Sequence, residues 1–97
     1  AVSFTVPVPD TTAPTAPTHL RTTSLTNSRV SLAWNAATDN KAVTGYRIYR
    51  NGTLVATVTT LTYSESRSRT QSAYVVYAID AAGNVSPASN SLVVAAR

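Results

Sequence analysis

The sequence lacks several residue types on which functional sites depend. Its 97 residues include no cysteine, one histidine, three glycines and four acidic side chains. The absence of cysteine excludes disulfides, thiolate metal sites and cysteine nucleophiles. Four dispersed acids are too few for a calcium site, which takes about six or more oxygen ligands. No apolar run approaches the roughly 18 residues of a membrane-spanning helix, so we expect no membrane partner.

The charge that is present is sparse and basic. Charged residues make up 12% of the chain, hydrophobic residues make up 43%, and the net charge is +4. This balance is typical of a globular domain with one core. Seven of the eight cations are arginines, at positions 21, 29, 47, 50, 67, 69 and 97. Because they are scattered, and not clustered with aromatics on one element, we expect a solvated surface and no nucleic-acid partner.

Alternating hydrophobic residues predict short strands and no helix. The expected strands are 18–25, 29–35, 44–50, 53–59, 61–64, 72–80 and 88–95. Asn51-Gly52 favours a tight hairpin, since both residues tolerate the positive φ of a type I′ turn. Gly83 supplies positive φ in the turn after Asp80. Seven short antiparallel strands separated by turns indicate an all-β sandwich.

The period of two along each strand predicts which residues form the core. We expect the only tryptophan, Trp34, to pack with Tyr46, Ile48, Tyr74 and Val76 between the sheets. The other inward positions are Leu20, Val30, Leu32, Leu61, Tyr63 and Ala78. In the last strand Val93 and Val94 compete for the core face, and the pattern leaves both open.

The chain divides by composition into three parts. Residues 1–9 alternate hydrophobic and other residues and contain two prolines, which fits an edge strand remaining from an upstream domain or a tail. Residues 10–17 are a linker rich in threonine and proline, which we expect to be extended and semi-rigid. The sandwich domain covers residues 18–97. We expect residues 1–16 to move relative to it and to make no tertiary contacts.

Three segments follow one another at set intervals: Trp34, Gly45 to Gly52, and Tyr74 to Asn84. In order and spacing they resemble a fibronectin type III domain of the kind found in secreted bacterial polysaccharide-degrading enzymes, such as chitinases and cellulases. The run from Asp10 to Pro14 is similar to the joints between modules of those enzymes. The resemblance covers residues 17–94 and implies a seven-stranded, immunoglobulin-like β-sandwich of three and four strands, without a disulfide.

The sequence departs from the family pattern before the sixth strand. Ser72 stands at the position of the family's corner tyrosine, and residues 64–71 contain no leucine. We therefore expect the connection before the sixth strand to lack the corner hydrogen bond and to be loose.

The resemblance implies a part of a larger secreted enzyme, not an enzyme in itself. The domain would be a monomeric extracellular spacer that holds catalytic and carbohydrate-binding domains of the same polypeptide apart. The residues agree with this, because a lone His19 provides no catalytic triad and Asp39 and Asp80 suit the capping of loop amides. We therefore expect no catalytic, cofactor-binding or metal-binding residues.

One surface feature supports a different function. If Tyr46 and Tyr74 point inward, then Arg47, Tyr49 and Tyr77 point outward on two neighbouring strands. Tyr49 and Tyr77 would then form a flat aromatic platform on which a sugar ring or a protein partner stacks. Such a module would bind insoluble polysaccharide or a neighbouring domain. The simpler interpretation is cross-strand pairing of residues with high β-propensity.

Overall fold

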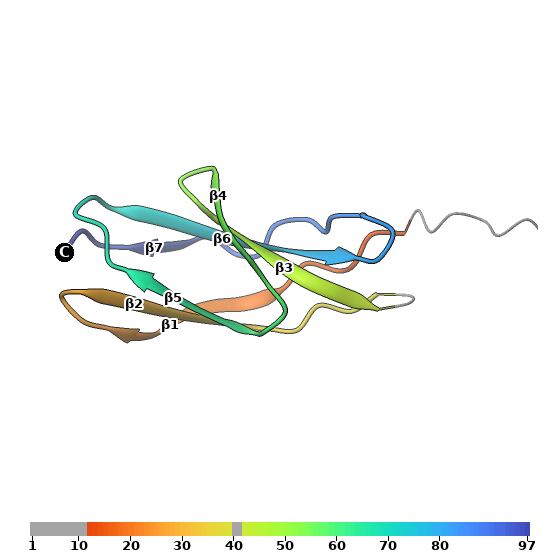
Figure 1. Ribbon diagram of the computed structural model, residues 1–97, viewed down its shortest axis with the longest axis horizontal. Helices are drawn as coiled ribbons and strands as arrows, with labels where there is room; N and C mark the ends of the chain where they lie inside the picture. The colour runs from red at the N-terminus through yellow and green to blue at the C-terminus, as the bar shows by residue number, and fades with distance from the viewer. Residues whose placement is uncertain (1–11, 40–41) are drawn as a thin grey trace, which may run out of the picture.

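The computed structural model describes residues 12–39 and 42–97, and every element in them is a β-strand (Figure 1). The strands are β1 (Thr18–Leu25), β2 (Arg29–Asn35), β3 (Val43–Arg50), β4 (Thr53–Val58), β5 (Thr62–Ser66), β6 (Ser72–Asp80) and β7 (Leu92–Val94). They pair antiparallel in a three-stranded sheet, β1-β2-β5, and a four-stranded sheet, β4-β3-β6-β7. The prediction of a seven-stranded antiparallel sandwich is confirmed.

The core lies between the two sheets and is built around Trp34. The ring of Trp34 meets Tyr46 edge-on, with centroids 5.7 Å apart and planes at 60°. The hydroxyl of Tyr46 accepts the Ala37 N–H at 3.1 Å inside the core. β6 supplies the most regular contribution, because its residues alternate between buried and half-buried over all nine positions. The core residues are Leu20, Val30, Leu32, Trp34, Ala37, Tyr46, Ile48, Tyr74, Val76, Ala78 and Val94.

Two details of the expected core are decided by the structure. Val94 is 4% exposed and Val93 is 56% exposed, so Val94 takes the inward position. The prediction for Leu61 is wrong, because its side chain is 40% exposed. Leu61 precedes the first residue of β5, and its contribution to the sheet is a carbonyl that accepts the Trp34 N–H at 3.1 Å. Tyr63 packs against the core from β5.

The hairpin between β3 and β4 has the turn that its sequence predicts. Asn51 has a φ of 52° and Gly52 a φ of 80°, as a type I′ turn requires. The Asn51 side chain also accepts the Ala73 N–H at 2.8 Å, which ties the turn to β6. This two-residue turn sets Arg50 opposite Thr53 and Tyr49 opposite Leu54. Beyond them the register shifts, so that Ile48 lies opposite Ala56.

The segment between β6 and β7 follows β6 without forming a strand. Side-chain hydroxyls of this segment accept hydrogen bonds from backbone N–H groups of β6. Ser86 accepts the Ala78 N–H at 2.8 Å, and Ser89 accepts the Val76 N–H at 2.9 Å. The strand predicted for residues 88–95 is accordingly shorter, because hydrogen bonds to these side chains take the place of a ladder.

Asn90 extends this side-chain pairing to the other sheet. Its amide bonds both the N–H and the carbonyl of Leu20 in β1, at 2.9 and 3.0 Å. One side chain therefore closes the gap between the two sheets beside β7.

The segment before β1 is packed against the sandwich. Pro14 and Pro17 are buried, and Thr15 exchanges hydrogen bonds with Thr38, through its N–H at 2.8 Å and its hydroxyl at 2.9 Å. The expectation that this segment makes no tertiary contacts is wrong for these residues, because the apolar proline rings gain by burial. The expected strand within residues 1–9 lies outside the described residues.

The connection between β5 and β6 is held by hydrogen bonds. Ser72, at the position expected for a corner tyrosine, is 2% exposed. The N–H of Arg67 donates to Ser28 O at 3.0 Å, and the Arg67 guanidinium donates to the carbonyls of Thr26, which follows β1, and of Ala95, which follows β7. The expectation of a loose connection is therefore not met, because the hydrogen bonds of Arg67 hold the connection against the segments that follow β1 and β7.

Candidate interaction surface

The outer face of the four-stranded sheet brings the three predicted surface residues together. Arg47 lies opposite Tyr77 across β3 and β6, and Tyr49 is the next outward residue of β3, opposite Val75. All of them are half-buried, since neighbouring side chains on the same face cover part of each. The alternation along β3 and β6 predicts this arrangement correctly.

The two tyrosines do not form a flat platform. Their ring centroids are 5.2 Å apart and their planes meet at 80°, an edge-to-face contact. Aromatic rings prefer this geometry, because the positive edge of one ring meets the negative face of the other. The expected platform is therefore wrong in shape: the pair presents one ring face and one ring edge, and a planar sugar surface cannot lie on both.

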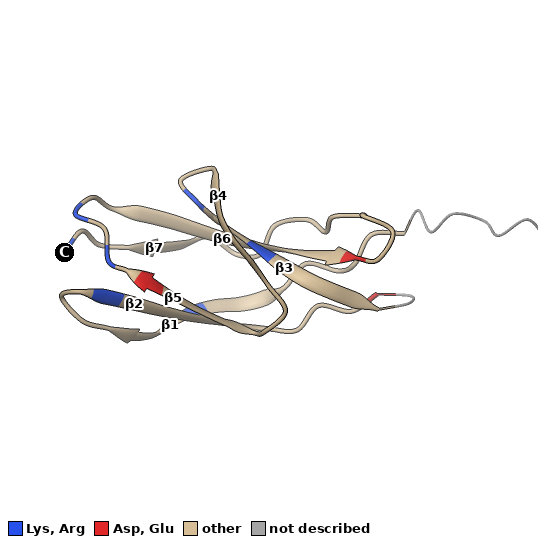
Figure 2. Cartoon of the chain, in the orientation of Figure 1, with Lys and Arg blue, Asp and Glu red and all other residues tan. Residues whose placement is uncertain are grey.

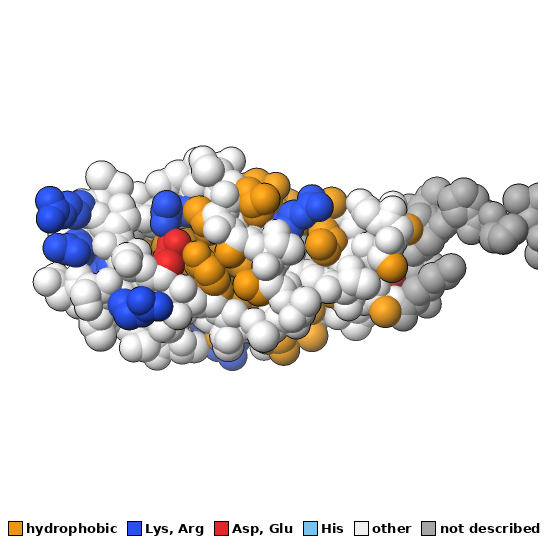
Figure 3. All heavy atoms as spheres, in the orientation of Figure 1, with side chains coloured by type: hydrophobic (Ala, Val, Ile, Leu, Met, Phe, Trp, Pro, Cys, Tyr) orange, Lys and Arg blue, Asp and Glu red, His pale blue; other side chains and the backbone are white. Residues whose placement is uncertain are grey.

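The same face carries more exposed apolar surface than the tyrosines alone. Leu54 of β4 pairs with Tyr49 and is 47% exposed. Val85 forms a bridge with Ile79 and is 42% exposed. Val93 of β7 pairs with Ala73 and is also exposed on this outer face. Figure 3 looks at the edge of the sandwich where β4 and β5 lie, and there hydrophobic side chains gather around β3 and β4.

Leu54 also belongs to this surface, and the sequence contains a signal for it. A two-residue turn at Asn51-Gly52 places Leu54 opposite Tyr49. Large exposed apolar surface often marks an interaction site, and the face as a whole is therefore the candidate surface.

A polar cluster lies at the open edge between the sheets. Glu65 of β5 accepts hydrogen bonds from Arg50 at 2.6 Å, from the Tyr63 hydroxyl at 3.0 Å and from the Tyr74 hydroxyl. The Glu65 side chain is 14% exposed, so these partners replace most of its hydration. The only glutamate of the chain is thus occupied by neutral and cationic donors.

The cluster changes the acidity of its members. Burial, and then the hydrogen bond to Glu65, raises the pKa of Tyr74 to about 12. The same two causes raise the pKa of Tyr63 above its ordinary value. The hydrogen bond to Glu65 raises the pKa of the Arg50 guanidinium. These shifts keep the phenols neutral and the guanidinium charged, which suits a structural cluster and not acid–base chemistry near neutral pH.

Asp80, the carboxylate that ends β6, also has a structural task. It accepts the backbone N–H groups of Ala82 and Asn84 at 3.0 and 2.9 Å, and so caps the turn that contains Gly83. In residues 12–39 and 42–97, no group of three or more histidine, cysteine or acidic side chains is placed to hold a metal ion. Within the same residues, no helix has the length and hydropathy of a membrane span.

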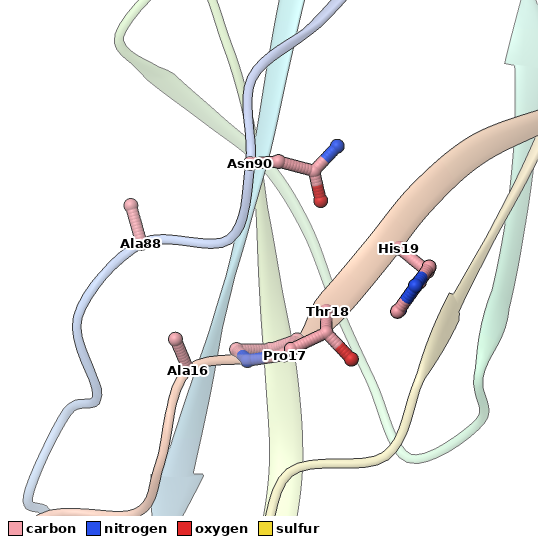
Figure 4. Close-up of a pocket in the computed structure, with 6 residues that line it drawn as sticks. All are labelled: Ala16, Pro17, Thr18, His19, Ala88 and Asn90. Carbon is pink, nitrogen blue, oxygen red and sulfur yellow. The ribbon is translucent and has the colours of Figure 1, made fainter.

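A shallow, open depression of about 440 Å³ lies beside the start of β1 (Figure 4). It is lined by Ala16, Pro17, Thr18, His19, Ala88 and Asn90. The ring nitrogen Nδ1 of His19 lies 3.2 Å from the Asn35 amide nitrogen, which can only donate, so Nδ1 accepts. His19 has a φ of 55°, where β1 is irregular. Apart from the imidazole of His19, the lining residues include no aromatic ring and no carboxylate. Their one hydroxyl group belongs to the exposed Thr18.

Comparison with known proteins gives relatives over most of the chain. No protein-family model matches it. The chitinase Chi52 of Paenibacillus xylanexedens is 49% identical over 88 residues, which is 89% of this chain and 17% of that protein. Exoglucanase B of Cellulomonas fimi is 47% identical over 88 residues, 89% of this chain and 8% of that protein. The chain therefore spans a small part of the curated relatives that it matches.

Solved structures give the same picture. The chitinase ChiA74 of Bacillus thuringiensis superposes with a TM-score of 0.81 at 31% identity, over 92% of this chain and 14% of that one. The central fibronectin III array of RIM-binding protein superposes with a TM-score of 0.72 at 19% identity, over 86% of this chain and 35% of that one. At 19% identity, the similarity to RIM-binding protein shows a shared fold and nothing more.

Proposed function

Because the chain is a fibronectin type III domain of the kind found in bacterial polysaccharide-degrading enzymes, we propose that it is a non-catalytic spacer in such an enzyme. It holds a catalytic domain and a carbohydrate-binding domain of the same polypeptide apart, as a monomeric module. Its parent works outside the cell, because insoluble polysaccharide cannot enter one.

The observation that carries this proposal is how the two ends of the module are fixed. The described chain begins at one end of the long axis and leaves at the other (Figure 1). At the first end Thr15 is bonded to Thr38, and at the second the Arg67 guanidinium bonds the carbonyls of Ala95 and Ala96. A spacer needs this arrangement, since fixed ends transmit direction as well as distance.

The length of the strands sets the distance between the domains on either side of the module. β6 has nine residues, and at about 3.3 Å per residue a strand of this length spans about 30 Å. Neighbouring domains would then be held about 3 nm apart. We propose that the joint with a preceding domain lies before Pro14, and not at Pro17 as the composition of residues 10–17 indicates, because both prolines are buried.

Replacement of the module in its parent enzyme tests this function. Deleting it should leave hydrolysis of soluble substrate unchanged and reduce attack on insoluble polymer. An unrelated rigid domain of similar length should restore the loss, whereas a flexible Gly/Ser linker with the same number of residues should not. A spacer role is ruled out if the rigid replacement fails to restore activity on the insoluble polymer.

The alternative is a binding module that contacts insoluble polysaccharide or a neighbouring domain through Arg47, Tyr49 and Tyr77. The exposure of Leu54, Val85 and Val93 on the same face favours it. The edge-to-face geometry of the tyrosines speaks against stacking on a flat polymer. In the intact enzyme, Tyr49→Ala with Tyr77→Ala should reproduce the deletion if the surface binds, and should have little effect if the module is a spacer.

A further inference from the structure

Arginines that lie far apart in the sequence come together at the end of the sandwich that bears the C-terminus (Figure 2). This surface, the arginine pole, consists of Arg29, Arg67, Arg69 and Arg97. Arg29 begins β2. The N–H of Arg67 donates to Ser28 O at 3.0 Å, and the N–H of Arg97 donates to Ser68 O at 3.0 Å. Three separate segments therefore lie side by side, which the scattered positions in the sequence do not indicate.

The side chain of Arg67 fixes the pole. Its Nη1 donates to the Thr26 carbonyl at 3.1 Å, Nε to the Ala95 carbonyl at 3.2 Å and Nη2 to the Ala96 carbonyl at 3.3 Å. Thr26 follows β1, and Ala95 and Ala96 follow β7, so one guanidinium joins the two sheets. The backbone segments that carry the pole are thus held together by bonds within the domain.

The positive charge of the pole is not balanced by the acids that the structure describes. Glu65 is committed to Arg50 and to two tyrosine hydroxyls. The acidic segments at the end of β6 and in the β2–β3 connection lie at the opposite end of the molecule in Figure 2. Among described residues, Arg69 and Arg97 form no ion pair. Surfaces that serve only solubility usually intersperse both signs.

We propose that the arginine pole docks a carboxylate-rich surface of a neighbouring protein domain. Arginine suits this partner, because its planar guanidinium binds a carboxylate through two parallel hydrogen bonds. The position of the pole also favours a domain of the same polypeptide, since Arg67 holds the carbonyls of Ala95 and Ala96 beside it. A domain attached there would face the pole at roughly millimolar effective concentration. Weak exposed ion pairs are then sufficient.

This inference goes beyond the spacer function and does not depend on it, because a module that binds polysaccharide through its outer face would carry the same pole. The test uses the whole 97-residue chain. Amide chemical shifts are followed by NMR while poly-L-glutamate, as a carboxylate-rich polypeptide, is added at low and at high salt. The shifts should move around Arg29, Arg69 and Arg97 and should recede at high salt, since salt screens exposed pairs.

A pair of matched variants separates the pole from net charge. Arg29→Gln with Arg69→Gln removes two charges at the pole, and Arg21→Gln with Lys41→Gln removes two charges that are not part of it. Arg67 stays in place in both, so the anchoring of the C-terminal segment is kept. The first pair should weaken binding of poly-L-glutamate about fivefold, as expected for two exposed ion pairs, and the second should leave it nearly unchanged.

Three results would overturn the proposal. Equal weakening in both variant pairs would show that net charge alone attracts the polymer. Tighter binding of polygalacturonate than of poly-L-glutamate would assign the pole to an acidic glycan. A dimer in sedimentation that the first variant pair dissociates would assign it to a second copy of this chain.

Discussion

Replacing Glu65 by alanine should lower the free energy of unfolding by about 3 kcal/mol, although Glu65 lies on an edge strand. The reason is that one carboxylate serves three donors at the boundary of the core. Arg50 lies 2.6 Å away, and the hydroxyls of Tyr63 and Tyr74 complete the set. After the substitution all three donors lose their acceptor together.

The magnitude follows from the exposure of each donor. Tyr74 is 1% exposed, so its hydroxyl would stay buried without a partner, which costs about 1–3 kcal/mol. Tyr63 is half-buried and loses a hydrogen bond worth about 1 kcal/mol. Arg50, with 34% of its side chain exposed, regains water, and its ion pair contributes at most about 1 kcal/mol. A loss of about 3 kcal/mol should lower Tm by about 12–24 °C in a domain of this size.

Urea unfolding followed by Trp34 fluorescence measures this loss, since Trp34 is the only tryptophan and lies in the core. Glu65→Gln is the matched control: its amide still pairs with the tyrosine hydroxyls and loses only the charge, so it should cost about 1 kcal/mol. Adding Tyr74→Phe to Glu65→Ala should recover part of the loss, because the orphaned hydroxyl is removed. A cost below about 1 kcal/mol for Glu65→Ala, or strict additivity of the pair, refutes the reasoning.

The remaining predictions concern the core, alkaline stability and the C-terminal segment. Trp34→Ala should cost about 3–5 kcal/mol in urea melts followed by circular dichroism, and a loss below about 1 kcal/mol would contradict its place in the core. The pKa of Tyr74 is raised from 10.0 to about 12, so the neutral phenol stabilises the fold fully below pH 10 and less as the pH rises to 12. Tyr74→Phe should therefore lose less stability than the wild type between pH 9 and about 11, and equal losses would show that another group titrates. Arg67→Ala should lower NMR order parameters of Ala95 and Ala96 to below about 0.6 while the strands stay near 0.85; Arg67→Lys should do the same, since an ammonium cannot reach three carbonyls at once.

The fold could be predicted from the sequence because its main determinants are local and periodic. Alternation in β3 and β6 assigns Tyr46, Ile48, Tyr74 and Val76 to the inner face, and Asn51-Gly52 defines one hairpin and the pairing next to its turn. Each of these signals lies within ten residues of chain. The same rule predicts Leu61 in the core, whereas its side chain is exposed, since the pattern alone does not tell where a short edge strand begins.

The features that the sequence did not reveal depend on contacts between distant segments. Ser89 and Asn90 replace strand pairing with side-chain hydrogen bonds, which leave no hydrophobic period to recognise. The prediction that Tyr49 and Tyr77 form a flat platform is wrong, because the orientation of the rings is set by side-chain rotamers and not by strand alternation. The arginine pole arises from the folding together of Arg29 and Arg67, residues that are far apart along the chain.

The most direct test of the central claim, that this domain acts through geometry and not by binding polysaccharide, is a pull-down of the isolated chain on insoluble chitin and cellulose. The variant Tyr49→Ala with Tyr77→Ala serves as the matched control, because both side chains are on the outer face and outside the core cluster. We expect the wild type and the variant to remain in solution to the same extent over both polymers. Retention of the wild type that the double tyrosine variant loses would contradict the account and establish the outer face as a polysaccharide-binding surface.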